Sequence, residues 1–213
     1  MANLIDTLPL IWAFATLFVV IDPIGLAPIF VALTQGIEPT KRKTIGLRAC
    51  MIAFVILALF GLFGDSVLGF AGISMPAFQI AGGALLFLTA MEMLFELRGK
   101  RRSTKGDELD DDDRDPSVFP LATPLIAGPG AIASIILLTN EAQGNLLQQI
   151  SVIVVMGAVV LTAFILFMLA GFIERALGQT GILVVSRVLG MLLAALAVQF
   201  ILNGLLGFSA TLG

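Results

Sequence analysis

The stretch that decides the fold is Asp22-Pro23-Ile24-Gly25-Leu26-Ala27-Pro28, which sets two prolines five residues apart inside a long apolar run. Proline has no amide hydrogen and clashes with the carbonyl four residues before it, so each proline interrupts a helix. The stretch Thr123-Pro124-Leu125-Ile126-Ala127-Gly128-Pro129 has the same proline spacing at an offset of 101 positions (Pro23 to Pro124, Pro28 to Pro129). The sequence therefore predicts two helices that are broken at equivalent places.

The composition places these runs in a membrane. Of the 213 residues, 58% are hydrophobic and 13% are charged, and the mean hydropathy is +1.04. Soluble domains have about a quarter charged residues, so a soluble globular domain, a disordered chain and a nucleic-acid-binding protein are excluded. The chain has no His and one Cys, Cys50. We therefore expect no disulfide framework, no His-ligated metal site, no cofactor and no Ser-His or Cys-His catalysis.

Six apolar stretches are long enough to cross a bilayer, which takes about 20 residues. They predict an all-α membrane protein with spans at 9–33, 46–64, 76–96, 118–140, 147–173 and 182–206. The long polar stretch 97–117, basic and then acidic, is expected to be a charged linker.

The distribution of basic residues predicts the orientation. All 12 Lys and Arg lie in, or beside, the loops 34–45, 97–117 and 174–181, and none lies on the side of the two termini. Cytoplasmic loops carry the excess of Lys and Arg. We therefore expect these three loops in the cytoplasm and both termini outside.

The two halves of the chain repeat. Besides the proline motifs, Phe63–Ile73 aligns with Phe172–Ile182 at an offset of 109 positions, with Phe, an acidic residue, Leu, two Gly and Ile shared. Residues 1–96 and 118–213 thus form two three-helix repeats. Because three is odd, the repeats enter the membrane from opposite sides. Inverted repeats are typical of secondary transporters, but they also occur in channels.

The broken helices predict a binding site. We expect Pro28 and Pro129 at the first position of a second half-helix, where a missing amide hydrogen costs nothing. The next amides would then be free to bind an anion, and the carbonyls freed by the prolines could receive an ammonium group. Such a site suits a zwitterion, whereas the alternative is that the prolines only kink their helices. The predicted substrate-binding residues are Asp22, Pro23, Gly25, Pro28, Ile29, Phe30, Thr123, Pro124, Gly128, Pro129, Gly130 and Ala131.

Asp22 is the one carboxylate in the middle of a predicted span. A charge there is costly unless it is paired, so it indicates function. Asp22 could accept the ammonium group, carry a coupling proton or help to hold a cation. The structural alternative is that it caps a half-helix. Thr123 is its neutral counterpart, and Glu92 is expected at the cytoplasmic interface.

The proline motifs Val20–Phe30 and Pro120–Ile132, together with Ile80–Gly83 and Gln199–Gly204, resemble those of the MarC family of bacterial inner-membrane proteins. The resemblance covers nearly the whole chain except the charged linker. It implies six spans, external termini and a relation to SnatA-type transporters of small neutral amino acids such as glycine and alanine.

We therefore expect a secondary transporter of a small neutral amino acid that works by alternating access, with a proton coupled through Asp22. The alternatives are a channel or facilitator, an intramembrane enzyme, for which the chain lacks His and a second mid-membrane carboxylate, and an assembly protein acting through 97–117. The expected partners are the substrate and the lipid bilayer, with no nucleic acid. A homo-oligomer is compatible with this interpretation.

Overall fold

The computed structural model describes residues 2–95, 115–142 and 145–210. All regular secondary structure in these ranges is helical, as expected. Five segments are long and apolar enough to cross a membrane, and the pair η1–α6 makes a sixth if its two bent parts are counted as one span. The elements are α1 (Ala2–Ile21), α2 (Pro23–Leu33), α3 (Pro39–Phe70), α4 (Met75–Leu94), η1 (Ser117–Ile126), α6 (Pro129–Glu141), α7 (Leu146–Met168) and α8 (Ala170–Ala210).

The helices extend further, and the connections are shorter, than the hydropathy profile predicts. The expected loop 65–75 is reduced to residues 71–74, with Gly72 at a φ of 70°. The expected loop 174–181 lies inside α8, which turns a corner at Gly178 (φ 63°, ψ 173°). Glycine permits these positive φ values. Hydropathy marks the apolar part of each helix and misses the polar turns that continue it. Most of the predicted linker 97–117 lies outside the described residues.

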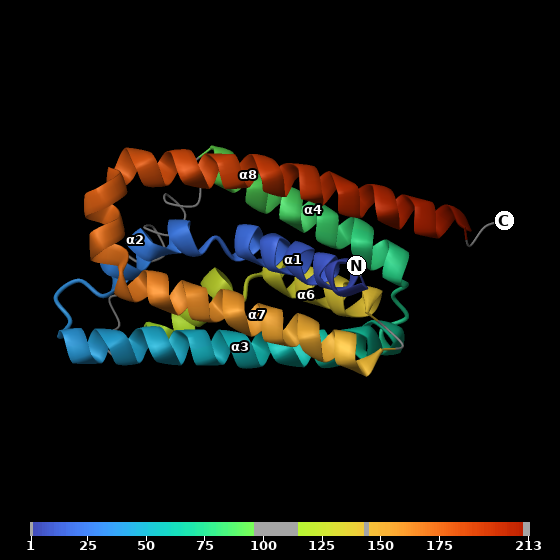
Figure 1. Ribbon diagram of the computed structural model, residues 1–213, viewed down its shortest axis with the longest axis horizontal. Helices are drawn as coiled ribbons and strands as arrows, with labels where there is room; N and C mark the ends of the chain where they lie inside the picture. Colours follow the sequence, from blue (N-terminus) through green and yellow to red (C-terminus); the bar gives the residue numbers. More distant parts are fainter. Residues whose placement is uncertain (1, 96–114, 143–144, 211–213) are drawn as a thin grey trace.

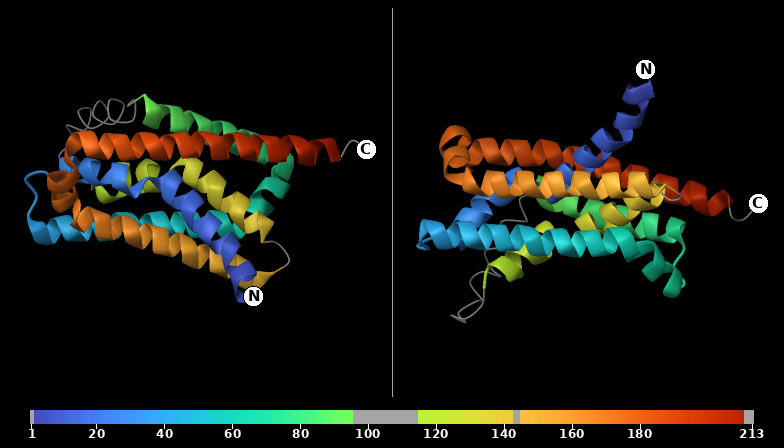
Figure 2. Two further views of the ribbon diagram at one scale, coloured as in Figure 1. Left: turned by 45° about the horizontal axis from the view of Figure 1, so that its top comes forward. Right: turned by 60° about the horizontal axis from the view of Figure 1, so that its bottom comes forward.

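Successive spans run in opposite directions (Figure 1). The pair α1–α2 runs one way along the bundle and η1–α6 runs the other way, as an inverted repeat requires. α1 begins and α8 ends toward the end that carries the connection 71–74 (Figure 1). The first part of α1 leans away from the other helices (Figure 2), and Ile11 and Trp12 there are exposed.

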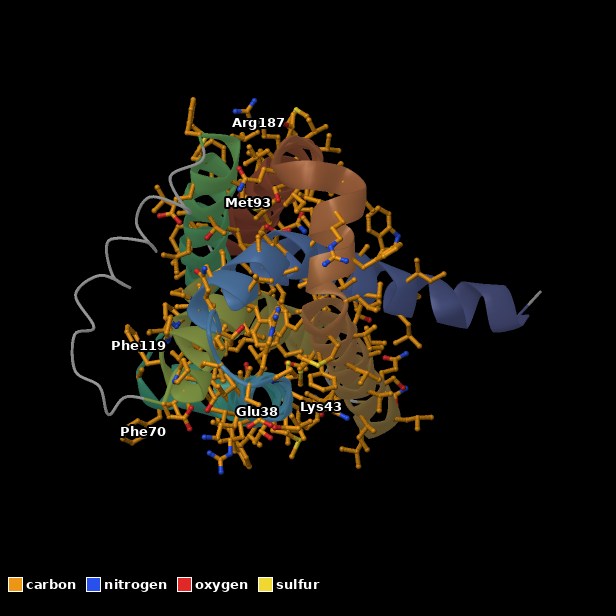
Figure 3. All side chains as sticks on the ribbon, turned by 90° about the vertical axis from the view of Figure 1, so that its left-hand side faces the viewer. Glu38, Lys43, Phe70, Met93, Phe119 and Arg187 are labelled. Atoms are coloured by element: carbon orange, nitrogen blue, oxygen red, sulfur yellow. The ribbon has the colours of Figure 1, made fainter. Side chains whose placement is uncertain are left out.

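The opposite end of the bundle carries the connection 34–38 and the corner at Gly178 (Figure 1). Figure 3 looks onto this end, with Glu38 and Lys43 on one side of the bundle and Arg187 on the other. The described basic residues all lie at the start of α3 or in the first half of α8, toward this end: Lys41, Arg42, Lys43, Arg48, Arg175 and Arg187. The expected segregation of charge is therefore present in the described residues.

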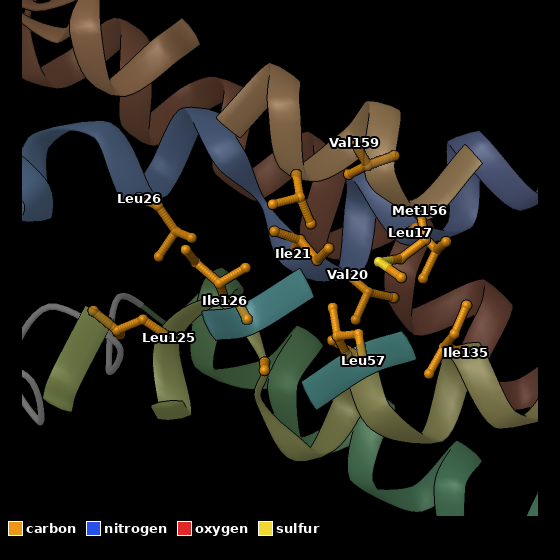
Figure 4. Close-up of a cluster of buried hydrophobic side chains, with 14 of the residues drawn as sticks. Leu17, Val20, Ile21, Leu26, Leu57, Leu125, Ile126, Ile135, Met156 and Val159 are labelled. Atoms are coloured by element: carbon orange, nitrogen blue, oxygen red, sulfur yellow. The ribbon is translucent and has the colours of Figure 1, made fainter. Parts of the chain in front are cut away.

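The two broken spans lie at the centre of the bundle. In the most apolar part of Pro9–Leu33, 56% of the residues are buried, against 22–33% in the other four long spans. In α6, 8 of 13 residues are buried. Figure 4 shows side chains from both broken spans meeting those of the surrounding helices. The labelled members of this core are Leu17, Val20, Ile21, Leu26, Leu57, Leu125, Ile126, Ile135, Met156 and Val159.

α4 and α8 lie side by side (Figures 1 and 2) and touch through glycines. A Cβ atom on Gly83 would lie 2.7 Å from the carbonyl oxygen of Ala197 and 2.7 Å from Ile201 Cγ1. A Cβ atom on Gly204 would lie 2.8 Å from the carbonyl oxygen of Pro76. Small residues let helix backbones approach closely inside a membrane. These glycines therefore set the distance between α4 and α8.

Candidate functional site

The first break lies at Asp22, between α1 and α2. Asp22 adopts the left-handed conformation (φ 54°, ψ 61°), which Asp tolerates better than most residues. Its Oδ1 accepts a hydrogen bond from the Gly25 amide at 3.1 Å, and its carbonyl accepts one from the Leu26 amide at 3.0 Å. Asp22 is buried, with 2% of the residue exposed. Asp22 is therefore the N-cap of α2, which confirms the structural alternative.

The predicted start of the second half-helix at Pro28 is wrong. α2 begins at Pro23, directly after its cap, because Asp22 supplies the acceptor and proline fits the first helical position. Pro28 lies inside α2. The amides of Ile29 and Phe30 therefore follow more than one turn of helix and do not form its N-terminal end.

Phe30 also points away from the predicted site. It is fully buried and stacks on Phe167 of α7, with the ring centroids 4.7 Å apart and the planes at 8°. The guanidinium carbon of Arg42 lies 5.1 Å from the centroid of the Phe30 ring, within the range of a cation–π interaction. Phe30 thus fixes the end of α2 against α7 and α3.

The second break is longer and lies between η1 and α6. Within η1, Phe119 (φ −132°, ψ 125°) and Thr123 (φ −131°, ψ 124°) are extended, because each precedes a proline that disfavours the helical conformation. The segments η1 and α6 meet at an angle of 56°. A Cβ atom on Gly128 would lie 2.6 Å from the carbonyl oxygen of Pro124, so this turn requires glycine.

α6 begins at Pro129, as predicted. Its N-cap is Gly128, and among the described residues no side chain caps this helix. The Ile132 amide donates to the Gly128 carbonyl, which leaves the preceding amides, those of Gly130 and Ala131, without an intrahelical acceptor. The first turn of α6 therefore presents backbone amides without a side-chain cap, whereas in α2 the carboxylate of Asp22 accepts from such an amide.

A cavity of about 330 Å³ lies beside the first turn of α6, lined by parts of α1, α2, α4, η1 and α6. It is lined by Val20, Ile29, Leu33, Leu85, Leu88, Thr89, Glu92, Phe119, Pro120, Pro124, Leu125, Ile126, Gly128, Pro129, Gly130 and Ala131.

The cavity brings together half of the predicted site residues: Ile29, Pro124, Gly128, Pro129, Gly130 and Ala131. The others do not line it. Asp22, Pro23 and Gly25 form the capped start of α2, Pro28 and Phe30 lie further along that helix, and Thr123 is exposed. The second break therefore supplies most of the predicted part of the site.

The predicted site residues include none from α4, although Thr89 was a weaker candidate for lining the cavity or joining helices. Leu85, Leu88, Thr89 and Glu92 line the cavity, and their spacing of three and four residues places them on one helix face. The Thr89 hydroxyl donates to the Leu85 carbonyl at 3.0 Å. It also lies 3.6 Å from where a Cβ atom on Gly130 would be, so it faces the first turn of α6. The helical spacing was visible in the sequence, but the direction of this face was not.

Residues 8–209 match the family described as MarC family integral membrane protein. The chain belongs to the MarC family. A UPF0056 membrane protein of Methanocaldococcus jannaschii is 39% identical over 92% of this chain and 86% of the relative. Membrane proteins of the same group from Archaeoglobus fulgidus (38% identical, 91% of this chain, 90% of the relative) and Escherichia coli (35%, 91% and 90%) are also similar. No solved structure matches the chain.

The family match spans both breaks and the cavity-lining face of α4. It confirms the resemblance based on the proline motifs, and together with the apolar helices it establishes a multi-pass integral membrane protein. The names of these MarC family relatives describe membrane proteins and state no substrate.

Proposed function

We propose that this MarC family protein is a secondary transporter of small neutral amino acids of the glycine and alanine type. The observation that carries the proposal is the cavity of about 330 Å³ at the uncapped first turn of α6. Small-molecule sites are commonly about 300–1,000 Å³, so this one suits a small solute. A free helix N-terminus favours a carboxylate.

The position of this turn inside a broken span supports transport. Transporters place their substrate where discontinuous helices meet, and their opposed repeats then move around that site. Here α1–α2 and η1–α6 run in opposite directions (Figure 1), and both contribute to the cavity. In the proposed arrangement the protein lies in the bacterial inner membrane with both termini in the periplasm and moves its substrate by alternating access.

Proton coupling through Asp22 is part of the proposal. Asp22 is a buried carboxylate at the first break and caps α2 through the Gly25 amide. Protonation would weaken a hydrogen bond that the charged carboxylate accepts strongly. The state of the proton would thereby alter the geometry of the break, and the helices on both sides of that break line the cavity through Val20 and Ile29.

Counterflow of labelled glycine in proteoliposomes that contain the purified protein tests the proposal. We expect saturable uptake that alanine and other small amino acids compete for. Gly128→Leu should abolish it, because the added side chain meets the Pro124 carbonyl and enters the cavity. Gly69→Leu is the matched control, since a Cβ atom on Gly69 has no neighbour within 4 Å among the described residues.

Two results would contradict this proposal in different ways. Single-channel currents carried by the purified protein would replace the carrier with a pore. Undiminished glycine binding by folded Gly128→Leu would remove the site from the first turn of α6. The folded state of each variant is checked by its elution and melting temperature in detergent.

A further inference from the structure

We propose that Glu92 recognises the amino group of the substrate and thereby makes the cavity prefer solutes that carry an amine. This inference rests on the proposed function and assigns one of its binding residues. Glu92 lies on α4, near the end of the span, where sequence reasoning placed it at the interface. The structure makes it part of the cavity wall.

The chemistry of the lining leads to this assignment. Among the described residues that line the cavity, the side chains are apolar except for Thr89 and Glu92, and only Glu92 is ionisable. Moving the ammonium group of an amino acid into such a space is unfavourable unless an acceptor replaces the lost water. The Glu92 carboxylate is the acceptor of matching charge.

The geometry of α4 places Glu92 on the wall beside the first turn of α6. Thr89 and Glu92 are three residues apart, so they lie on the same face of the helix. Thr89 faces Gly130 in the first turn of α6, as its distance to a Cβ atom there shows. The first turn of α6 and the face of α4 that carries Glu92 are therefore adjoining walls of the cavity. An α-amino acid needs this arrangement because its two charged groups are attached to one carbon atom.

Asp22 does not fill this role. Its carboxylate caps α2 through the Gly25 amide and does not line the cavity. It also adjoins α8, because a Cβ atom on Gly25, which would overlap the Asp22 carboxylate, would lie 2.9 Å from Ser186 Oγ. Two carboxylates thus have two separate functions. Asp22 shapes the break, and Glu92 meets the substrate.

The test compares glycine with glycolate, which carries a hydroxyl group in place of the ammonium group. Binding of both is measured by competition against labelled glycine, and by thermal shift where labelled glycine no longer binds. In Glu92→Gln we expect glycine to bind roughly 10-fold more weakly or worse, the usual effect of losing a hydrogen bond to a charged group. Glycolate affinity should not fall. Glu141→Gln, a change of the same kind at the far end of α6, should leave both affinities unchanged.

Glu92→Asp keeps the charge and shortens its reach. We expect it to weaken glycine and not glycolate, and this variant decides the question if Glu92→Gln does not fold. An equal loss of both ligands, or no loss of either, in a folded variant would overturn the assignment while wild-type uptake of glycine upheld the transporter. A wild-type protein that binds no small amino acid would overturn the proposed function and this assignment with it.

Discussion

The first break depends on the side chain of one residue, Asp22, which combines a left-handed backbone with a cap on the next helix. Few residues satisfy both demands. Asp and Asn tolerate positive φ values, and both accept hydrogen bonds from the amides of a helix start. Alanine does neither.

At this position we expect Asp22→Asn to fold almost as stably as the wild type and Asp22→Ala to lose about 1–2 kcal/mol, the usual cost of a lost cap. Melting temperatures of the purified protein in detergent measure the difference. If Asp22 also carries the coupling proton, Asp22→Asn should keep glycine counterflow and lose uptake driven by a proton gradient. Equal melting temperatures for the two variants would contradict the role of the cap.

Asp22 and Glu92 show which property of a single residue the sequence predicts and which it does not. The position of a carboxylate along a span gives its depth in the membrane, and depth drew attention to Asp22. Which wall a side chain faces depends on the rotation of its helix, which the packing of α4 against α8 decides. Glu92 could not be assigned to a cavity without that information.

At the scale of the element, the prolines predicted both breaks, but they did not determine where each helix restarts. In the first repeat the restart is at Pro23, because Asp22 caps the helix immediately. In the second repeat Thr123 is extended and exposed and does not act as the cap, and the helix restarts only at Pro129. The proline spacing allows the helix to restart at either proline. The residue before the first proline therefore decides which of the two begins the helix.

The close contact between α4 and α8 predicts that Gly→Ala lowers the melting temperature at this contact and does not lower it at an open position. Gly83→Ala should lower the melting temperature, because its Cβ atom would lie 2.7 Å from a backbone carbonyl, and overpacking costs about 1–3 kcal/mol. Gly69→Ala should not lower it, because the space there is open among the described residues and alanine favours a helix by about 1 kcal/mol over glycine. A Gly83→Ala protein as stable as the wild type would show that the two helices can separate freely.

At the scale of the whole molecule, the segregation of charge predicted which helix ends lie together, and the described residues agree. This follows because a chain of alternating spans has only two sides. The sequence did not predict the steep lean of the first part of α1 (Figure 2), because hydropathy measures length and carries no information about tilt.

The orientation itself is open to a direct measurement. In a Cys50→Ala background, Ile73→Cys should react with a membrane-impermeant maleimide in intact cells. Thr40→Cys should react only after the membrane is permeabilised. Both positions are exposed and lie at opposite ends of α3. The reverse pattern of labelling would invert the proposed arrangement and place both termini in the cytoplasm.

The two helix starts at the breaks differ in where an anion for their free amides comes from. The Asp22 carboxylate is tethered three residues from the Gly25 amide, so its effective concentration there is fixed whatever the surroundings contain. Gly128 offers no such tether at the start of α6. In the proposed transporter, the anion at that turn comes from solution, so the fraction of sites it occupies depends on its concentration. The helix start in the first repeat is thus always occupied by the protein's own carboxylate. The helix start in the second repeat responds to the concentration of a ligand.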